Sequence, residues 1–126
     1  MTKWEADFWV TLCVYFESRG EPRLGQKFVA HTIYNRAEQR NQSVKDVIFA
    51  PKQFSWANNG NRPAIDDYQA FINCGNAVQE ALLERKEGFT AYGADHYHAT
   101  WIEPPSWIKC MDVVTIIGQH TFYRST

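Results

Sequence analysis

The stretch WEADFWVTLCVYFESRGEP, residues 4–22, joins a long apolar run to a cluster of charged and turn-forming residues. Apolar side chains recur on one broad face from Trp4 to Phe16, which predicts an amphipathic helix near the centre of the fold. Thr2 is a candidate N-cap for this helix, because such polar side chains accept the free amide hydrogens of a first turn. Gly20 fits the left-handed residue that ends a helix, and Pro22 then stops its continuation. We therefore expect a central helix that carries its charged residues at its C-terminal end.

The remaining chain predicts more helices, followed by a small β element. The expected elements are helices over about 23–39 and 44–50, a polar loop over 53–63, and short strands over 94–100, 113–117 and 120–124. Asp66 or Asp67 is expected to open a further helix that runs to about Arg85, with Tyr68 among the apolar residues of its packed face. Ser43 is the expected N-cap of the short helix, and Pro51 is expected to end it. Because the helices precede the strands, the sequence predicts an α+β fold that is mostly helical, with the β element in the C-terminal third. A chain of 126 residues fits one domain over 1–126.

Composition and charge exclude several classes of function. The net charge is −1, from 13 basic and 14 acidic residues that are scattered along the chain. We therefore expect neither a nucleic-acid nor a membrane partner, since both demand clustered basic residues. Glu5 and Asp7 interrupt the first apolar stretch, so it does not resemble a signal peptide, and synthesis in the cytoplasm is expected. We expect a monomer.

The cysteine pattern argues against a disulfide framework. Cys13, Cys74 and Cys110 are odd in number and widely spaced, and no Cys-x-x-Cys pair occurs. One disulfide with one free thiol remains open on these spacings. Buried free thiols are the favoured interpretation, because Cys13 and Cys74 lie within apolar surroundings.

Glu17 is the strongest candidate for a catalytic residue. It ends the apolar helix beside Tyr15 and Phe16. Burial penalises the charged carboxylate and raises its pKa, so such a group can still hold a proton near neutral pH. A protonated carboxyl can donate to the leaving oxygen of a glycosidic bond. The alternative is a structural glutamate that is paired with Arg19 or another cation.

Two neighbours of Glu17 have both a functional and a structural interpretation. Ser18 is a candidate substrate-binding residue, or it bonds the backbone of its own helix. Glu21 is a candidate second carboxylate that contacts substrate, or its charge favours the N-terminus of the next helix.

The segment Asp95-His96-Tyr97-His98 is a further candidate for substrate binding through His96, Tyr97 and His98. In a strand, His96 and His98 share one face. Paired imidazoles can bind a metal when a third ligand such as His120 joins them, which would suit a zinc-dependent amidase. The other interpretation is a polar rim that bonds substrate or backbone, with no metal and no cofactor.

The loop Gln53-Phe54-Ser55-Trp56 combines an amide, rings and a hydroxyl. Such a mixture suits the amide and hydroxyl groups of an N-acetylated sugar, so Gln53, Phe54 and Ser55 are candidate substrate-binding residues. The alternative is a loop that its aromatic residues pack down onto the core.

These segments together resemble the SleB/CwlJ family of cell-wall hydrolases, known from spore-cortex lytic enzymes and some phage lysins. The resemblance covers nearly the whole chain and is carried, in order, by Glu17 to Pro22, Gly25-Gln26 with Ile33 to Arg36, Gln53 to Ser55, and Ile117 to Tyr123. The first segment is similar to the family's Glu-Ala-Arg-Gly-Glu-Pro, and the last to its Ile-Gly-x-His-x-Phe-Tyr. One segment alone would be weak, whereas four in the same order are specific.

The resemblance implies a lysozyme-like catalytic domain that cleaves the bond between N-acetylmuramic acid and N-acetylglucosamine in peptidoglycan glycan strands. It implies a lytic transglycosylase or muramidase with a single catalytic glutamate, which is Glu17 here. The alternatives are a zinc-dependent N-acetylmuramoyl-L-alanine amidase and a non-catalytic peptidoglycan-binding domain.

The chain departs from the family pattern at two places. Ser18 replaces the more usual Ala, and residues 95–98 stand where many relatives carry Tyr-Tyr and Asn-Pro, which puts direct sugar contacts there in doubt. A catalytic domain without an export signal is also what we expect of a phage endolysin that a holin releases to the bacterial wall.

Overall fold

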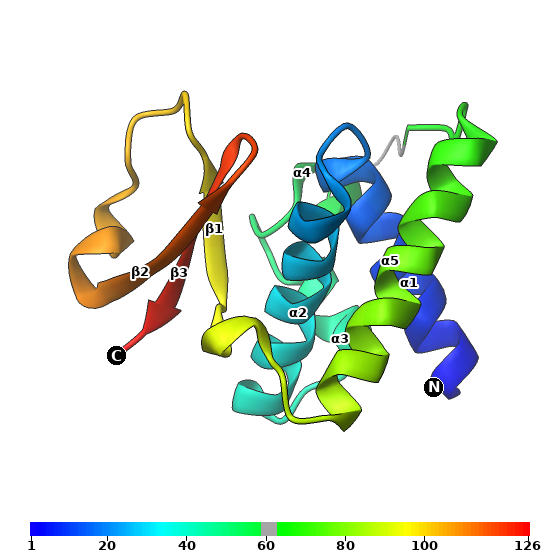
Figure 1. The fold of residues 1–126 in the computed structure, drawn as a ribbon, viewed down its shortest axis with the longest axis horizontal. Coiled ribbons are helices and arrows are strands. Elements are labelled where there is room, and N and C mark those ends of the chain that lie inside the picture. Colours follow the sequence, from blue (N-terminus) through cyan, green and yellow to red (C-terminus); the bar gives the residue numbers. More distant parts are fainter. Residues whose placement is uncertain (59–62) are drawn as a thin grey trace.

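The computed structural model describes residues 1–58 and 63–126, and it separates into a helical lobe and a sheet lobe (Figure 1). The helices are α1 (Lys3–Ser18), α2 (Arg23–Arg40), α3 (Val44–Phe49), α4 (Ser55–Asn58) and α5 (Tyr68–Lys86). The strands are β1 (His96–Ala99), β2 (Met111–Ile117) and β3 (His120–Ser125), with short 3₁₀ turns η1 (Ala91–Gly93) and η2 (Ser106–Cys110) between the longer elements. The predicted α+β fold, with its β element last, is confirmed.

The helix starts follow the polar side chains that the sequence suggested. The Thr2 hydroxyl accepts from the Glu5 amide at 3.1 Å, and the Ser43 hydroxyl accepts from the Asp46 amide at 3.1 Å. At the start of α5, the Asp67 carboxylate accepts from the Ala70 amide at 3.0 Å. Each cap satisfies an amide that has no partner within its own helix, which explains why the helices begin at these residues.

Three expectations about local structure were wrong. Gly20 does not adopt a left-handed conformation, since α1 ends at Arg19 with φ −58°, and the side chain of Gln26 holds the carbonyl groups there instead. The loop expected over 53–63 contains the short helix α4, because Trp56 and Ala57 are drawn into the core, while 59–62 lie outside the described residues. Tyr68, expected on the packed face of α5, is 75% exposed because it lies in the first turn, at the edge of the lobe.

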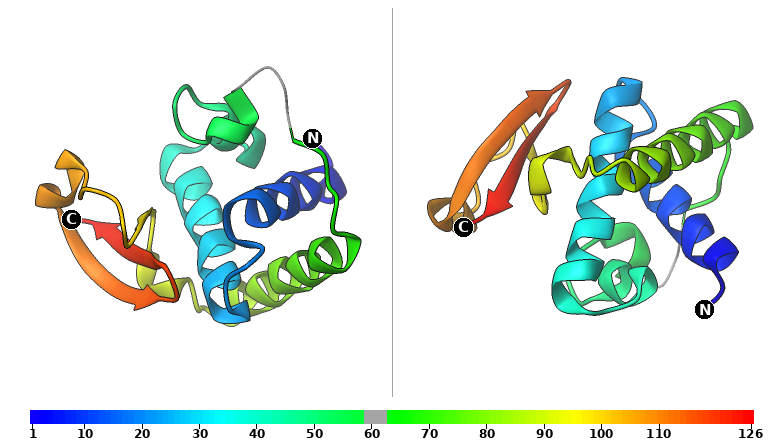
Figure 2. Two further views of the ribbon diagram at one scale, coloured as in Figure 1. Left: turned by 90° about the horizontal axis from the view of Figure 1, so that it is seen from above. Right: turned by 60° about the horizontal axis from the view of Figure 1, so that its bottom comes forward.

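The helical lobe packs around α2, which contacts both α1 and α5 (Figure 2). Its core is made of aliphatic side chains from all three long helices and α3, among them Val10, Val29, Ile33, Ile48 and Val78. Cys13 and Cys74 are free and buried within this lobe, as expected, whereas Cys110 is free and exposed. Among the described helices none is long and apolar enough to cross a membrane.

The sheet is antiparallel, with β3 between β1 and β2. Tyr97 is the register partner of Phe122, and both point toward the helices, where Phe122 packs on Phe28 with ring centroids 5.3 Å apart. Side chains alternate along a strand, so His96 and His98 lie on the outer face, against Trp107 of η2. The sheet thus presents one face to the helical lobe and covers much of the other with an aromatic cluster.

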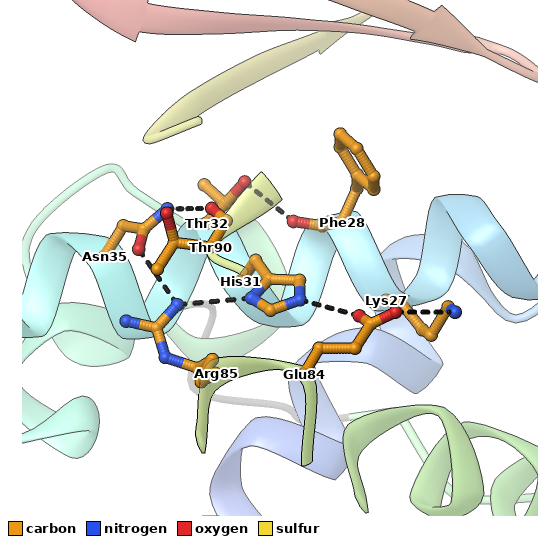
Figure 3. A network of polar contacts seen from close by, with 8 residues as sticks. All are labelled: Lys27, Phe28, His31, Thr32, Asn35, Glu84, Arg85 and Thr90. Carbon is orange, nitrogen blue, oxygen red and sulfur yellow. Dashed lines mark hydrogen bonds and ion pairs between the residues drawn. The ribbon is translucent and has the colours of Figure 1, made fainter. Parts of the chain in front are cut away.

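A polar network joins α2 to α5 at the base of the helical lobe (Figure 3). His31 is fully buried, its Nε2 lies 2.9 Å from Glu84, and its Nδ1 accepts from Arg85 at 3.2 Å. Lys27 donates to the other oxygen of Glu84 at 3.1 Å, and Arg85 also donates to Asn35 at 2.9 Å. Each buried polar group in this network has a partner, which is the condition for a stabilising role.

Candidate active site

Glu17 lies in the last turn of α1 and faces the sheet lobe. The hydroxyl of Tyr97, on β1, donates to Glu17 Oε1 at 2.5 Å, which joins residues 80 positions apart in the chain. Burial raises the pKa of Glu17, and the Tyr97 hydrogen bond and the charge of Arg36 oppose that rise only in part. The carboxyl therefore holds its proton to a higher pH than an exposed glutamate does, as the sequence predicted.

The carboxyl of Glu17 is not sealed in the core, because it lines a pocket of about 240 Å³. The walls come from the end of α1, the α1–α2 link, the loop after β1 and the β2–β3 turn. The lining residues are Phe16, Glu17, Ser18, Arg19, Gly20, Glu21, Trp101, Gln119 and His120. A group that is desolvated by its neighbours and still reaches a pocket can exchange a proton with a bound molecule.

The C-terminal end of α1 is held by the start of α2. The side-chain amide of Gln26 donates to the carbonyl oxygens of Ser18 and Arg19 at 3.2 and 3.3 Å. Gly25 lets α2 approach the sheet, since a Cβ at this position would lie 3.3 Å from Ile117 Cγ2. The Gly-Gln pair of the sequence motif thus positions the helix turn that carries Glu17.

Glu21 connects the helical lobe to the β2–β3 turn. Its Oε1 accepts from the Gln119 amide at 2.7 Å and lies 3.5 Å from His120 Nδ1. Gly118 has φ +55°, and a Cβ there would lie 2.6 Å from the same oxygen, so the turn needs glycine. Glu21 lines the pocket, and its contacts anchor the turn, so contact of Glu21 with substrate stays a prediction.

Two residues of α2 fix the backbone that leads into β1. The Asn35 amide donates to the carbonyl oxygens of Thr90 and Ala94 at 3.0 and 2.7 Å. Buried Arg36 donates from Nε to the Asp95 carbonyl at 2.6 Å. This support sets the start of the strand from which Tyr97 reaches Glu17. Sequence reasoning quoted the Asn-Arg pair only as part of a motif and assigned it no role at the site.

The predicted sugar-binding loop does not contribute to the pocket lining. Gln53 Oε1 accepts from Arg36 at 3.1 Å, and the buried ring of Phe54 lies 5.8 Å from the same guanidinium. Ser55 is exposed at the start of α4. The loop is thus packed against the support of β1, which is the structural interpretation, and sugar contacts by these three residues stay a prediction.

The contacts of Ser18 agree with its structural interpretation, a hydrogen bond to the backbone of its own helix. It is 3% exposed, and its hydroxyl donates to the Val14 carbonyl at 2.8 Å, one turn earlier in α1. It still lines the pocket, so a contact with substrate stays a prediction. Arg19, the expected structural partner of Glu17, lies instead 3.9 Å from Asp66.

The structure separates the two histidines of β1 from the acid. His98 is held by the hydroxyl of Tyr123 and by the Ala99 carbonyl, both at 2.8 Å, on the outer face of the sheet. His96 Nδ1 lies 3.0 Å from the Asp95 carboxylate. Of the three residues predicted from this segment, Tyr97 alone reaches Glu17, because alternate strand residues face opposite sides. Substrate contact by His96 and His98 beside the acid is therefore not supported by their placement.

The metal hypothesis also lacks its third ligand. His120 lies on the inner face of the sheet, with its ring 5.0 Å from that of Tyr97, whereas His96 and His98 are on the outer face. Within residues 1–58 and 63–126, no group of three potential ligands is arranged to hold a metal ion. The arrangement therefore does not match a zinc site built on these imidazoles.

An α+β domain that holds a desolvated carboxyl at a pocket between its lobes has the arrangement that a general acid requires. The comparisons with known proteins give the family. The chain belongs to the cell wall hydrolase family, whose model matches residues 20–123. Glu17 lies just before the matched range, at the end of the helix that leads into it.

Curated relatives and solved structures extend this assignment. The spore cortex-lytic enzyme of Bacillus cereus is 33% identical over 114 residues, which cover 88% of this chain and 41% of the relative. That of Bacillus subtilis is 31% identical over 112 residues, covering 86% and 34%. This chain thus spans about two fifths or less of these relatives' length.

Two solved structures share the fold. The catalytic domain of the Bacillus cereus SleB protein superposes with a TM-score of 0.72 at 30% identity, covering 95% of this chain and 91% of that one. The catalytic domain of the germination-specific lytic transglycosylase SleB from Bacillus anthracis gives 0.74 at 28% identity, covering 98% and 97%. The resemblance stated from sequence motifs is therefore confirmed.

Proposed function

We propose that this domain cleaves the bond between N-acetylmuramic acid and N-acetylglucosamine in peptidoglycan, with Glu17 as its single acid and base. The observation that carries the proposal is the carboxyl of Glu17, whose pKa is raised by burial and which still lines a pocket. The solved relative named as a lytic transglycosylase supports the reaction, and the curated relatives named as cortex-lytic enzymes support the substrate.

The chemistry needs one proton donor that later accepts a proton. Protonated Glu17 donates to the glycosidic oxygen as the bond from C1 of the muramic residue to that oxygen breaks. The resulting carboxylate then takes the proton of the sugar's own 6-hydroxyl, whose oxygen bonds to C1. Glu17 ends protonated, and the product carries a 1,6-anhydro end. Because the nucleophile belongs to the substrate, no second carboxylate is required, unlike the usual two-carboxylate scheme.

Tyr97 orients the acid in this proposal. Its hydroxyl donates to Glu17 Oε1, so the other oxygen, Oε2, is the one left for the glycosidic bond. The same hydrogen bond stabilises the carboxylate that forms after the proton has left. Tyr97 therefore lowers the energy of the charged intermediate state, while burial favours the protonated carboxyl before proton transfer.

A muramidase would use water in place of the 6-hydroxyl. Glu21 is the other carboxylate in the pocket lining, but its Oε1 already accepts from the Gln119 amide. This contact favours an anchoring role over activation of water, and it supports the transglycosylase version of the proposal.

We also propose that the domain acts on the wall as a monomer. The pocket is lined by residues of one chain, and the acid and its hydrogen-bond partner both belong to that chain. The net charge of −1 supports recognition through shape and hydrogen bonds rather than through strong electrostatic attraction.

The test is mass spectrometry of purified peptidoglycan after digestion. An anhydro-muramic end is expected, whereas a plain reducing end would assign a hydrolase with the same site. Freed stem peptides without glycan cleavage would overturn the proposal, as would wall binding that releases nothing soluble. A parallel digestion with a chelator is expected to proceed unchanged, because Glu17 chemistry needs no metal, and loss of activity there would favour an amidase.

A further inference from the structure

Trp101 differs from the other tryptophans because its indole has no ring beside it in the described part of the chain. Of the five tryptophans, Trp4 stacks on Phe8, while Trp9, Trp56 and Trp107 lie against Phe49, Phe16 and His96 respectively. The indole of Trp101 makes no ring contact with the described part of the chain and is 70% exposed. It nevertheless lines the same pocket as Glu17. The pocket therefore has a large apolar face along its edge that nothing in the described chain covers.

The backbone around Trp101 is anchored rather than free. The Thr100 amide donates to the Gln119 carbonyl at 2.8 Å, and the Ile102 amide donates to the Ala99 carbonyl at 3.3 Å. Gln119 is itself held by Glu21, through its own amide, at 2.7 Å. A chain of hydrogen bonds thus runs from the α1–α2 link, which follows Glu17, to the turn that carries Trp101. The position of the indole relative to the acid is set before any ligand arrives, which reduces the entropic cost of binding.

Gln119, another residue of the pocket lining, has a side-chain amide without a partner in the described chain. Only the backbone of Gln119 is used in the anchor, and its side-chain amide forms no hydrogen bond with residues 1–58 or 63–126. Gln119 and Trp101 line the same pocket. An aromatic face beside an amide matches a pyranose ring that carries an N-acetyl group, because the C–H face of a sugar is apolar and its substituent needs a hydrogen-bond partner.

We propose that Trp101 is a substrate-binding residue that stacks on a pyranose ring next to the bond that Glu17 cleaves, with the Gln119 side chain bonding the N-acetyl group. This inference rests on the proposed function. It goes beyond that function in assigning a binding subsite to the loop after β1. Because the stacked ring stays in contact before and during proton transfer, the contact contributes to substrate binding more than to the chemical step.

The chain offers a matched control in Trp4. Its side chain is 75% exposed, close to that of Trp101, but it lies at the start of α1 and lines a separate pocket with Phe8 and Ile72. If the effect of Trp101 came only from losing an exposed indole, then Trp4→Ala would show it equally.

The first experiment measures steady-state kinetics on soluble glycan strands freed of stem peptides. Trp101→Ala is expected to raise KM about five- to tenfold with kcat within about twofold, since a contact equally strong in both states affects KM alone. Trp101→Phe is expected to restore most of the affinity, and Trp4→Ala to match the unaltered protein. A KM for Trp101→Ala equal to that of Trp4→Ala would overturn the proposal, as would a loss confined to kcat.

A second experiment measures binding without cleavage. In the Glu17→Gln background, the same strands are expected to change the tryptophan fluorescence. That change should persist when Trp4→Phe is added and disappear when Trp101→Phe is added. A fluorescence change that persists in the Trp101→Phe variant would show that the sugar contacts other indoles, and it would overturn the proposed subsite. If the unaltered protein instead frees stem peptides from intact peptidoglycan and leaves the glycan uncut, the proposed function fails, and this outcome is distinct from a failure of the subsite alone.

Discussion

Glu17 in α1 and Glu84 in α5 both lie near the C-terminal end of a long helix, and their surroundings differ in kind. Glu84 accepts hydrogen bonds from Lys27 and His31, on two different oxygens. Glu17 accepts one hydrogen bond in the described chain, from the neutral hydroxyl of Tyr97. Glu84 is thus paired with a cation and also bonded to an imidazole, whereas Glu17 has no ion pair within the described chain.

The pKa values of the two groups shift in opposite directions for this reason. Burial alone would raise the pKa of Glu84, but the hydrogen bonds from His31 and Lys27 outweigh it and lower the pKa. At Glu17 burial dominates, and the pKa rises. A fully partnered carboxylate stabilises the packing of α2 on α5 (Figure 3), whereas an under-partnered one beside a pocket is available for chemistry. Glu17 and Glu84 have the same residue type and a similar position in their helices, so neither property distinguishes the reactive carboxyl from the structural one.

The largest expected effect separates the two glutamates by activity. Glu17→Gln keeps the shape of the side chain and removes its proton, so cleavage of peptidoglycan is expected to fall about 10²- to 10⁴-fold. Glu84→Gln, the matched change in the other region, is expected to keep kcat within about twofold, because Glu84 does not line the pocket of Glu17. Release of soluble glycan fragments measures both. Normal lysis by Glu17→Gln would remove Glu17 from the mechanism.

The second prediction concerns stability, for which Glu84 is expected to matter more than Glu17. Glu84→Gln loses a charged acceptor for Lys27 and for the buried His31, and is expected to lower the free energy of unfolding by about 1–2 kcal/mol. In a domain of this size that corresponds to a Tm lower by roughly 4–8 °C at pH 7. Thermal unfolding followed by circular dichroism measures it. An unchanged Tm would contradict a stabilising role for the network.

Tyr97→Phe sharpens the account of the acid site. The phenyl ring keeps its packing on Phe122, whose centroid lies 5.6 Å away, and only the hydrogen bond to Glu17 is lost. That bond opposes the rise in the pKa of Glu17, so its loss raises this pKa further. Because Glu17 must be protonated to act as the acid, the alkaline limb of kcat/KM is expected to move to higher pH.

The same variant is expected to lower kcat about tenfold, since the acid loses the donor that orients it. Tyr123→Phe is the control, because the Tyr123 hydroxyl contacts His98 on the outer face of the sheet. Its pH profile should overlay that of the unaltered protein. An alkaline limb that moves to lower pH in Tyr97→Phe would contradict the assigned direction.

The smallest expected effect is the pH dependence of stability. The folded-state pKa of Glu17 lies above the usual value of 4.5, so its penalty is absent below that pH and develops as pH rises through the folded pKa. Glu17→Gln removes the penalty, so its stability relative to the unaltered protein should increase from pH 4 to pH 7. Glu84 has a lowered pKa, and its contribution is present at pH 7 and lost as pH falls through that value. The two variants should therefore shift Tm in opposite directions at pH 7. Shifts of the same sign would contradict the opposite effects on stability assigned to the two carboxylates.

Much of the fold could be predicted from the sequence because its signals are local. The helix caps at Thr2, Ser43 and Asp67 and the order of helices before strands follow from neighbouring residues. Glu17 itself could be predicted because its apolar neighbours lie on the same helix. The failed predictions also have local causes. Gly20 was assigned a left-handed cap, but a side chain six residues further on, Gln26, closes the helix instead.

The candidate site could be predicted only in part, because it is assembled from distant segments. The segment 95–98 was proposed as one binding unit, yet the alternation of the strand puts Tyr97 on the side of the acid and His96 and His98 on the other. Which side faces the helices depends on how the sheet docks. Trp101 carried no signal at all in the sequence, since nothing in its neighbours tells that its loop lies beside Glu17.

The sequence by itself determined where the long helices and the strands form, which residues cap the starts of α1 and α3 and which carboxyl lies at the end of the central apolar helix, because periodicity and capping act over a few residues. Only the tertiary structure decided that Tyr97 meets Glu17 across 80 positions, that Glu84 is fully partnered, and that Trp101 borders the pocket. The pKa of a carboxyl depends on everything packed around it, so the difference between a structural and a reactive glutamate exists only once the chain has folded.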